Sequence, residues 1–276
     1  MRASVYIVMF LTTVFLSVND TFAQRETFLS RSSFGPMVGG SYYIGDLNPY
    51  RHFYNTQLSF GLKYRYAVNS RAALRIGATY AEVGADDAGA KDPNQQLRNL
   101  SFHSTIFEVA GGIEFNYMNY KFGDKKYMFT PYMFIDVGVF QMNPMTEYNG
   151  EWIELQPIGT EGQGSVYSDK DYYSLTQLVI PMGIGFKLNL GKRASLSLEY
   201  GIRKTFTDYL DDVGGEYINP LLISDENGTL ATRLSNRSLP GYDALGPRGN
   251  SATSDWYSVF GVMLTFPLGK ASNCHY

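Results

Sequence analysis

LVIPMGIGFKLNL, residues Leu178–Leu190, is the stretch that decides the fold. Every second residue from Leu178 to Leu190 is apolar, and the residues between them are small or polar. This alternation is the two-residue period of a β-strand with one apolar face. The stretch exceeds the roughly 9–11 residues that a tilted strand needs to cross a bilayer. A turn at Gly191–Arg193 and a second alternating segment, Ser195–Arg203, follow it. Two long strands joined by a tight turn are the repeating unit of a transmembrane β-barrel.

The first residues predict export. A basic start at Met1-Arg2 precedes the apolar run Val5–Val18 and a small-residue exit that ends at Ala23. This order predicts a secretory signal peptide over residues 1–23, which leaves residues 24–276 as one domain. The alternative is a retained N-terminal anchor. The formal charge of −3 argues against nucleic acid as a partner, and one cysteine forms no internal disulfide.

The rest of the chain repeats the strand pattern. Connections one, three, five and seven are long and polar, whereas two, four and six are short, as in a barrel with long outer loops and tight periplasmic turns. We therefore predict an all-β, eight-stranded antiparallel transmembrane β-barrel of the bacterial outer membrane; the alternative is a secreted β-sandwich. We expect Tyr66, Tyr80, Tyr117, Tyr120 and Trp256 to form interfacial girdles. The eight alternating segments are Gly35–Ile44, Leu58–Tyr66, Ala72–Val83, Phe107–Tyr117, Phe129–Val139, Leu178–Leu190, Ser195–Arg203 and Asp255–Phe266.

Charged residues fall on the strand faces opposite the apolar ones, which places them in the lumen. An eight-stranded barrel is just wide enough for its own side chains to fill, and unpaired buried charges cost several kcal/mol. We therefore expect a plug of paired charges, without a solute-sized channel. The predicted network consists of Lys63, Arg65, Arg75, Lys187 and Arg203 with Glu108, Glu114, Asp136 and Glu199.

No catalytic site is predicted. His103 lies near Ser101 and Ser104, with Glu108 further along the same strand, and Ser101 and His103 share a face. No signature marks either serine as a nucleophile, so an interfacial histidine is the simpler interpretation. The acidic clusters Asp86-Asp87 and Asp208–Glu216 offer hard oxygen ligands but lack the spacing of a calcium loop. We assign no metal and no cofactor.

The periplasmic side offers candidate partner-binding residues. Cys274 lies past the last strand, in an oxidising compartment. A leftover cysteine in an exported chain suggests an intermolecular disulfide with a periplasmic partner; a free thiol is the alternative. The predicted turns and tail form a basic rim suited to anionic lipid or an acidic partner face. Its residues are Lys125, Lys126, Lys192, Arg193 and Lys270.

Two motifs and the chain end resemble a known family. They are GGSYYIGDLNP at Gly39–Pro49, TDYLDDVGGEY at Thr207–Tyr217, and Asp255-Trp256-Tyr257 followed by an apolar strand and a short basic tail with Cys274. In this order they are similar to small Bacteroidetes outer-membrane barrels that include PorG of the type IX secretion system. The resemblance implies a non-enzymatic subunit that anchors or assembles the secretion machinery through the periplasmic lipoprotein PorK and the ring component PorN. The alternatives are a lipid-modifying hydrolase and an adhesin-like barrel with binding outer loops.

Overall fold

The structure, a computed structural model, describes residues 28–166, 168–240 and 246–268. The predicted signal peptide over residues 1–23 and the tail that carries Lys270 and Cys274 lie outside these ranges. The strands are β1 (Ser32–Ile44), β2 (Gln57–Ala67), β3 (Ala72–Asp86), β4 (Ser101–Asn116), β5 (Phe129–Tyr148), β6 (Glu151–Glu154), β7 (Thr176–Asn189), β8 (Ser195–Thr205) and β9 (Trp256–Leu268). The helices are α2 (Pro93–Arg98), α3 (Pro220–Glu226) and α4 (Gly228–Ser235), with single 3₁₀ turns at Asp87–Gly89 and Gln156–Ile158.

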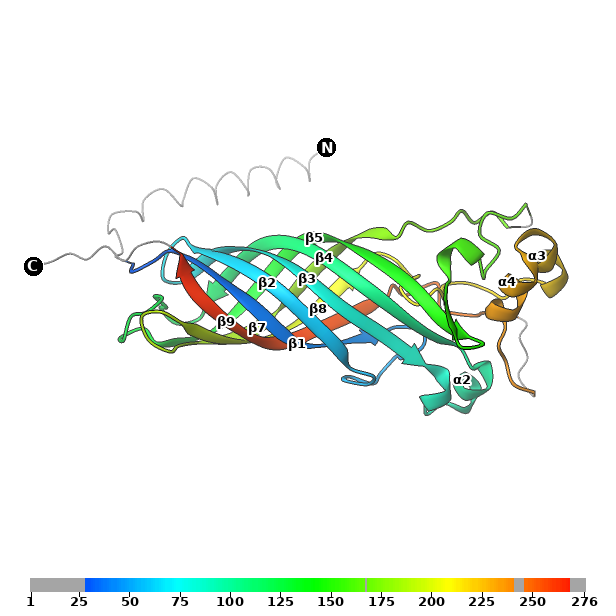
Figure 1. The fold of residues 1–276 in the computed structure, drawn as a ribbon, viewed down its shortest axis with the longest axis horizontal. Coiled ribbons are helices and arrows are strands. Elements are labelled where there is room, and N and C mark those ends of the chain that lie inside the picture. The colour runs from blue at the N-terminus through cyan, green and yellow to red at the C-terminus, as the bar shows by residue number, and fades with distance from the viewer. Residues whose placement is uncertain (1–27, 167, 241–245, 269–276) are drawn as a thin grey trace, which may run out of the picture.

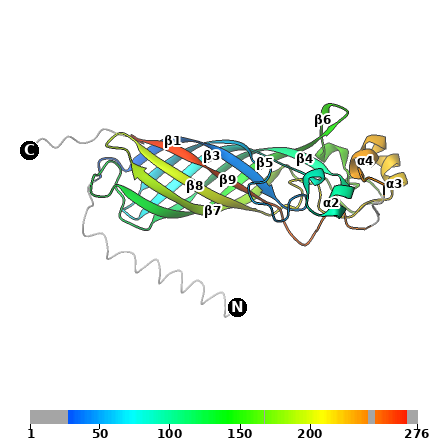
Figure 2. The same ribbon diagram turned by 90° about the horizontal axis from the view of Figure 1, so that it is seen from below.

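Eight of these strands form a closed antiparallel barrel (Figures 1 and 2). Each pairs with its neighbours in the order β4, β3, β2, β1, β9, β8, β7 and β5, and the pairing of β4 with β5 closes the ring. The first and last strands are joined from Ser32 opposite Leu268 to Ile44 opposite Trp256. The predicted fold class is therefore confirmed.

The strand boundaries differ from the prediction mainly at one end. β3, β4 and β5 run past their predicted limits to Asp86, back to Ser101 and on to Tyr148. β6 pairs with the far end of β5 and makes a hairpin that the sequence analysis did not predict. The three helices also lie in connections that were expected to be loops. These segments escaped prediction because their short apolar runs lack the long alternation of the barrel strands.

The outward face of the barrel is apolar. On β5, Met133, Ile135, Val137 and Val139 are 47–64% exposed, and Leu58, Phe60 and Leu62 on β2 are 48–61% exposed. Soluble proteins rarely expose contiguous apolar patches of this kind. A closed barrel satisfies its backbone hydrogen bonds internally, as lipid requires. The protein is accordingly an outer-membrane barrel.

The two ends of the barrel differ. The turns at residues 68–71 and 190–194 lie at the left end in Figure 1, whereas α2, α3 and α4 gather at the right end. Figure 2 shows β6 at the same end as these helices. The end with short turns faces the periplasm in barrels of this type. Among the described residues, no helix is long and apolar enough to cross a membrane.

Candidate functional site

The lumen holds all nine charged residues of the predicted network. Each is at most 5% exposed, and each forms at least one ion pair within the set. They project inward because side chains alternate across a strand and the intervening apolar residues face outward. Five bases thus share four acids in the middle of the barrel.

Glu199, on β8, is the centre of this network. It pairs with Lys63, and its oxygens lie 3.0 Å from the guanidinium nitrogens of Arg75 and 3.3 Å from Nη2 of Arg65. The hydroxyl of Tyr132 donates to Oε2 of Glu199 at 2.8 Å. One carboxylate therefore compensates charges on β2 and β3, across the barrel from β8.

Glu114, on β4, forms a second centre. It pairs with Lys187 on β7, and its Oε2 lies 2.9 Å from Nε of Arg65 and 3.7 Å from Nη1 of Arg75. Asp136, on β5, forms an ion pair with Arg75, with its Oδ2 3.1 Å from Nε. Arg65 and Arg75 therefore link the two centres into one network.

A third group lies closer to the outer end. Nε of Arg203 is 3.3 Å from Oε2 of Glu108, and the hydroxyl of Tyr257 donates to the same oxygen at 2.7 Å. Arg203 also donates to the carbonyl oxygens of Gly201 and Val259. This pair is thus held by both walls of the barrel.

Aromatic rings fill the space beside the charges. The ring centroid of Phe134 lies 3.9 Å from the guanidinium carbon of Arg75. A Cβ added to Gly183 or Gly201 would come within 2.9 Å of this ring, and one added to Gly185 would come within 2.3 Å of Tyr132. Glycines on β7 and β8 therefore make room for rings that project from β5, the strand beside β7.

The outer half of the lumen is apolar, which the sequence analysis did not predict. Its fully buried members include Ile106, Phe140, Met142 and Val259, and they form one cluster with Leu210 and residues of the outer connections. On the extensions of β4 and β5 these buried residues alternate with outward residues that are mostly polar, such as Thr105, Gln141 and Asn143. The lumen is consequently a charged layer beneath an apolar one.

The longest connection, residues 206–255, plugs the outer mouth. Leu210 and Val213 are at most 1% exposed and join the apolar cluster. The hydroxyl of Tyr43 lies 2.6 Å from a carboxyl oxygen of both Asp211 and Asp255. Burial, followed by repulsion from Asp255, raises the pKa of Asp211 well above its ordinary value. The tyrosine hydroxyl joins the connection to β1.

A buried guanidinium fastens the plug to a second connection. Nη1 of Arg248 lies 3.2 Å from Oε1 of Glu161, and Oε1 also accepts from the backbone N–H groups of Gly214 and Gly215. Burial raises the pKa of Glu161, but Arg248 and Lys170 outweigh it, so the pKa lies below the ordinary value. We call the plug and the residues that hold it the outer cap.

The outer cap should be more stable at acidic than at alkaline pH. Burial, followed by repulsion from Asp46, raises the pKa of Asp208 to about 8, and burial raises the pKa of Asp212 to about 6. The folded cap then holds protons that unfolded aspartates release near pH 4. The stability that protonation of Asp208 and Asp212 gives the cap is therefore fully present below about pH 4. It is lost as pH rises through about 6 to 8, the folded-state pKa values.

Hydrogen exchange of residues 206–255, corrected for intrinsic exchange, measures this effect. Protection should be greater at pH 5 than at pH 8.5. Asp208→Asn should remove the part of the change above pH 7, whereas Asp225→Asn on the exposed side of α3 should not. Equal protection at both values would contradict the interpretation.

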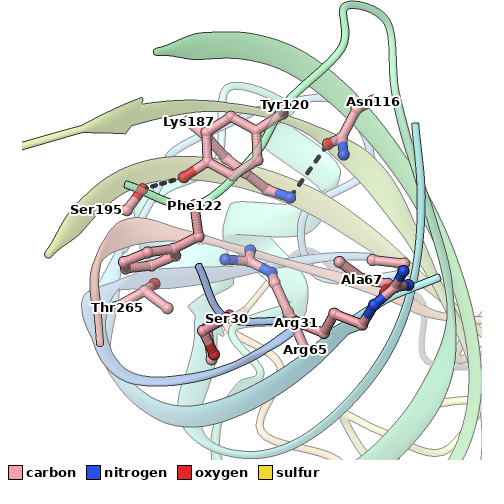
Figure 3. Close-up of a pocket in the computed structure, with 12 residues that line it drawn as sticks. Ser30, Arg31, Arg65, Ala67, Asn116, Tyr120, Phe122, Lys187, Ser195 and Thr265 are labelled. Atoms are coloured by element: carbon pink, nitrogen blue, oxygen red, sulfur yellow. Dashed lines mark hydrogen bonds between the residues drawn. The ribbon is translucent and has the colours of Figure 1, made fainter. Parts of the chain in front are cut away.

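The periplasmic mouth is closed by the connection between β4 and β5. Tyr120 and Phe122 are 8% and 7% exposed, and both point into the ring of strands in Figure 3. The hydroxyl of Tyr120 donates to Oδ1 of Asn189 at 2.6 Å and lies 2.7 Å from Oγ of Ser195. The cavity that remains there is about 30 Å³, room for little more than a water molecule. The expected girdle position of Tyr120 is therefore wrong, because the connection turns inward.

The basic residues predicted for the periplasmic rim lie close together. Lys125, Lys126, Lys192 and Arg193 are all exposed. Their two turns touch, since a Cβ on Gly123 would lie 3.1 Å from Cα of Lys192. Arg31, Arg71 and Lys121 add positive charge at the same end, and Asp124 is the single acid in these described turns. Lys270 and Cys274 lie outside the described residues.

The residues considered for catalysis are separated. Ser101 and His103 are on the outward face of β4, whereas Glu108 is in the lumen with Arg203. Ser101 Oγ accepts from Nη1 of Arg237 at 3.0 Å, and the ring of His103 lies 5.5 Å from that of Trp152. In residues 28–166, 168–240 and 246–268, no three His, Cys, Asp or Glu side chains are placed to hold a metal.

Carboxylates of the two acidic clusters form ion pairs and hydrogen bonds between the outer loops. Asp87 accepts from Nε and Nη2 of Arg98 at 2.7 and 2.8 Å. The hydroxyls of Thr160 and Tyr173 donate to Asp212, which also faces Arg248. These carboxylates therefore tie connections together.

Comparisons with solved structures give similar chains at low sequence identity. Neisserial surface protein A matches with a TM-score of 0.44 and 8% identity, over 87% of this chain and 98% of that one. The Yersinia pestis attachment invasion locus protein Ail matches with a TM-score of 0.36 and 13% identity, over 86% of this chain and 99% of that one. The outer membrane protein OprG of Pseudomonas aeruginosa matches with a TM-score of 0.37 and 10% identity, over 87% of this chain and 100% of that one.

No curated protein matches the sequence. A family model described as a domain of unknown function (DUF6089) matches residues 8–219, which is more than half of the chain. The protein belongs to this DUF6089 family.

Proposed function

We propose that this protein is a non-enzymatic barrel subunit that anchors or assembles type IX secretion machinery through its periplasmic rim. The observation that carries the proposal is the pairing of a filled lumen with an exposed basic end. Side chains occupy the barrel at the periplasmic mouth, at the charged layer and at the outer cap. A barrel filled in this way is suited to binding rather than to passage.

The periplasmic rim is chemically suited to an acidic partner. Lys125 and Lys126 border a cleft of about 360 Å³ that also contains Met118, Tyr127 and Met128. Positive side chains around an apolar floor attract a negatively charged surface and bury its apolar residues. The resemblance to the PorG family points to the periplasmic lipoprotein and ring components, of the PorK and PorN type, as the partners. An intermolecular disulfide at Cys274 would strengthen the same contact.

Affinity purification in mild detergent tests this proposal. The tagged protein should recover the ring components, and charge reversal of Lys125, Lys126, Lys192 and Arg193 to Glu should reduce recovery at least about tenfold. The matched control reverses Lys91 and Arg233 at the outer end and is compared with the double reversal of Lys125 and Lys126. Recovery that is unchanged by the periplasmic reversals, or absent from the parent protein, would reject the proposal. Comparison of Cys274→Ser on non-reducing gels tests the disulfide.

Planar-bilayer recording tests the filled lumen. We expect no stable solute-sized conductance, because buried side chains of the charged layer and the outer cap fill the lumen. A refolded sample whose electrophoretic mobility shifts on boiling provides the control for barrel formation. A robust open-channel current from such a sample would show that the lumen is open.

A lipid-modifying hydrolase is the main rival. Unchanged lipid A in a deletion strain would exclude it. The positions of Ser101, His103 and Glu108 on opposite faces of β4 disfavour this alternative.

A further inference from the structure

A large cavity lies at the outer end, away from the periplasmic rim. It has a volume of about 550 Å³, within the usual range for small-molecule sites. Three connections line it: residues 45–56, residues 87–100 with α2, and residues 247–250. Neither the barrel wall nor the outer cap requires a cavity here.

The walls of this cavity are fixed by Arg98. Besides pairing with Asp87, its guanidinium donates to the carbonyl oxygens of Arg248 at 2.8 Å and Asp46 at 3.1 Å. Both carboxyl oxygens of Asp46 lie within 3.1 Å of the backbone nitrogen of Asn250. One buried side chain thus joins all three connections. A ligand would therefore meet a preformed site and would not have to order the loops.

Flat aromatic surfaces line the cavity. Tyr50 lines the cavity and is 88% exposed. The guanidinium carbon of Arg51 lies 3.6 Å from the ring centroid of Tyr54, and Nη1 of Arg51 donates to the carbonyl oxygen of Gly89. Tyr54 is therefore held in place, while Tyr50 offers its ring to a ligand.

Polar groups complete the lining, and their charges nearly balance. Gln95 donates through Nε2 to the carbonyl oxygen of Asp46. Lys91 and Asp92 are exposed and of opposite sign. The positive charges of Arg98 and Arg248 are already compensated by buried carboxylates. A polyanion would find no surplus positive charge, and a purely apolar ligand would leave polar groups unpaired.

We propose that this cavity binds a short neutral oligosaccharide. A pyranose ring has an apolar C–H face that packs on a tyrosine ring, and its hydroxyls both donate and accept hydrogen bonds. Tyr50 supplies the ring, and Asp46, Gln95 and Lys91 supply fixed or nearby polar groups. The site opens at the outer end of the barrel, where cell-surface glycans are present. It is independent of the periplasmic rim, so either proposal can fail alone.

Saturation-transfer NMR with the full barrel in nanodiscs tests the proposal. One arm uses the oligosaccharide released by mild acid from the producing bacterium's own lipopolysaccharide, and the other uses maltotriose and chitotriose from outside sources. We expect saturable binding in at least one arm. Tyr50→Ala should weaken it by about tenfold, because an aromatic contact is lost. Tyr50→Phe should retain it.

The matched control is Tyr172→Ala, another exposed tyrosine of an outer connection, 46% exposed and outside the cavity. Folding of each variant is checked by the mobility shift on boiling. The proposal is overturned if no probe binds with a dissociation constant below about 10 mM. It is also overturned if Tyr50→Ala and Tyr172→Ala have equal effects. Binding in one arm only identifies the source of the sugar.

Discussion

Glu199→Ala should destabilise the barrel by about 3–5 kcal/mol, the usual consequence of removing one partner from a buried ion pair. Glu199 is buried and compensates Lys63, Arg65 and Arg75 together. Its removal leaves five bases with three acids in a water-poor interior. Urea unfolding in detergent, followed by the mobility shift, measures the change in free energy.

Two comparisons separate charge from volume. Glu147→Ala removes an exposed glutamate from the extension of β5 and should change stability by less than about 0.5 kcal/mol. Adding Lys63→Met to Glu199→Ala should recover part of the loss, because one unpaired base is then absent. If Glu199→Ala and Glu147→Ala destabilise the barrel by equal amounts, the ion pairs of Glu199 contribute little to stability and the prediction is wrong.

Leu210→Ala should loosen the outer cap while the barrel stays folded. Leu210 is fully buried in the apolar cluster, and truncating such a leucine typically costs about 2–5 kcal/mol. Since 1.4 kcal/mol is tenfold, the equilibrium for cap opening should rise at least about 30-fold. Protease cleavage within residues 206–255, measured on intact vesicles, reports that opening.

The exposed Leu221 of α3 provides the control for this prediction. It is 76% exposed, so Leu221→Ala should leave the cleavage rate unchanged. The mobility shift of both variants should match that of the parent protein. Loss of that shift in Leu210→Ala would mean that the cap and the barrel unfold together.

The strands of the barrel wall were predictable because the pattern that marks each strand lies within its own short segment of sequence. Lipid on one side and a narrow lumen on the other impose a two-residue period on every strand. Met133 and Asp136, for example, face opposite sides as the alternation requires. The inward direction of Lys63 or Glu199 follows from the same rule. The alternation does not predict which base pairs with which acid, because the pairing depends on the register of strands that are distant in the sequence.

The outer end was not predictable in the same way. Leu210 and Val213 stand among acids in an irregular segment, so no period marks them as buried. The cavity depends on Asp46 meeting Asn250, residues that are 204 positions apart. The burial of Tyr120 and Phe122 was not predictable for a related reason, because the turn sequence around them is polar. Such contacts arise only after the barrel has brought the connections together.

The placement of Glu199 also bears on biogenesis. Its partners Lys63 and Arg75 precede it by 136 and 124 residues. A nascent sheet made of β1, β2 and β3 alone would carry cations into the bilayer with no counter-charge, at a cost of several kcal/mol each. Glu114 and Asp136, on β4 and β5, can compensate Arg65 and Arg75, but Lys63 pairs with Glu199. Stepwise insertion from the N-terminus is therefore disfavoured, because Lys63 gains its counter-charge only when β8 arrives.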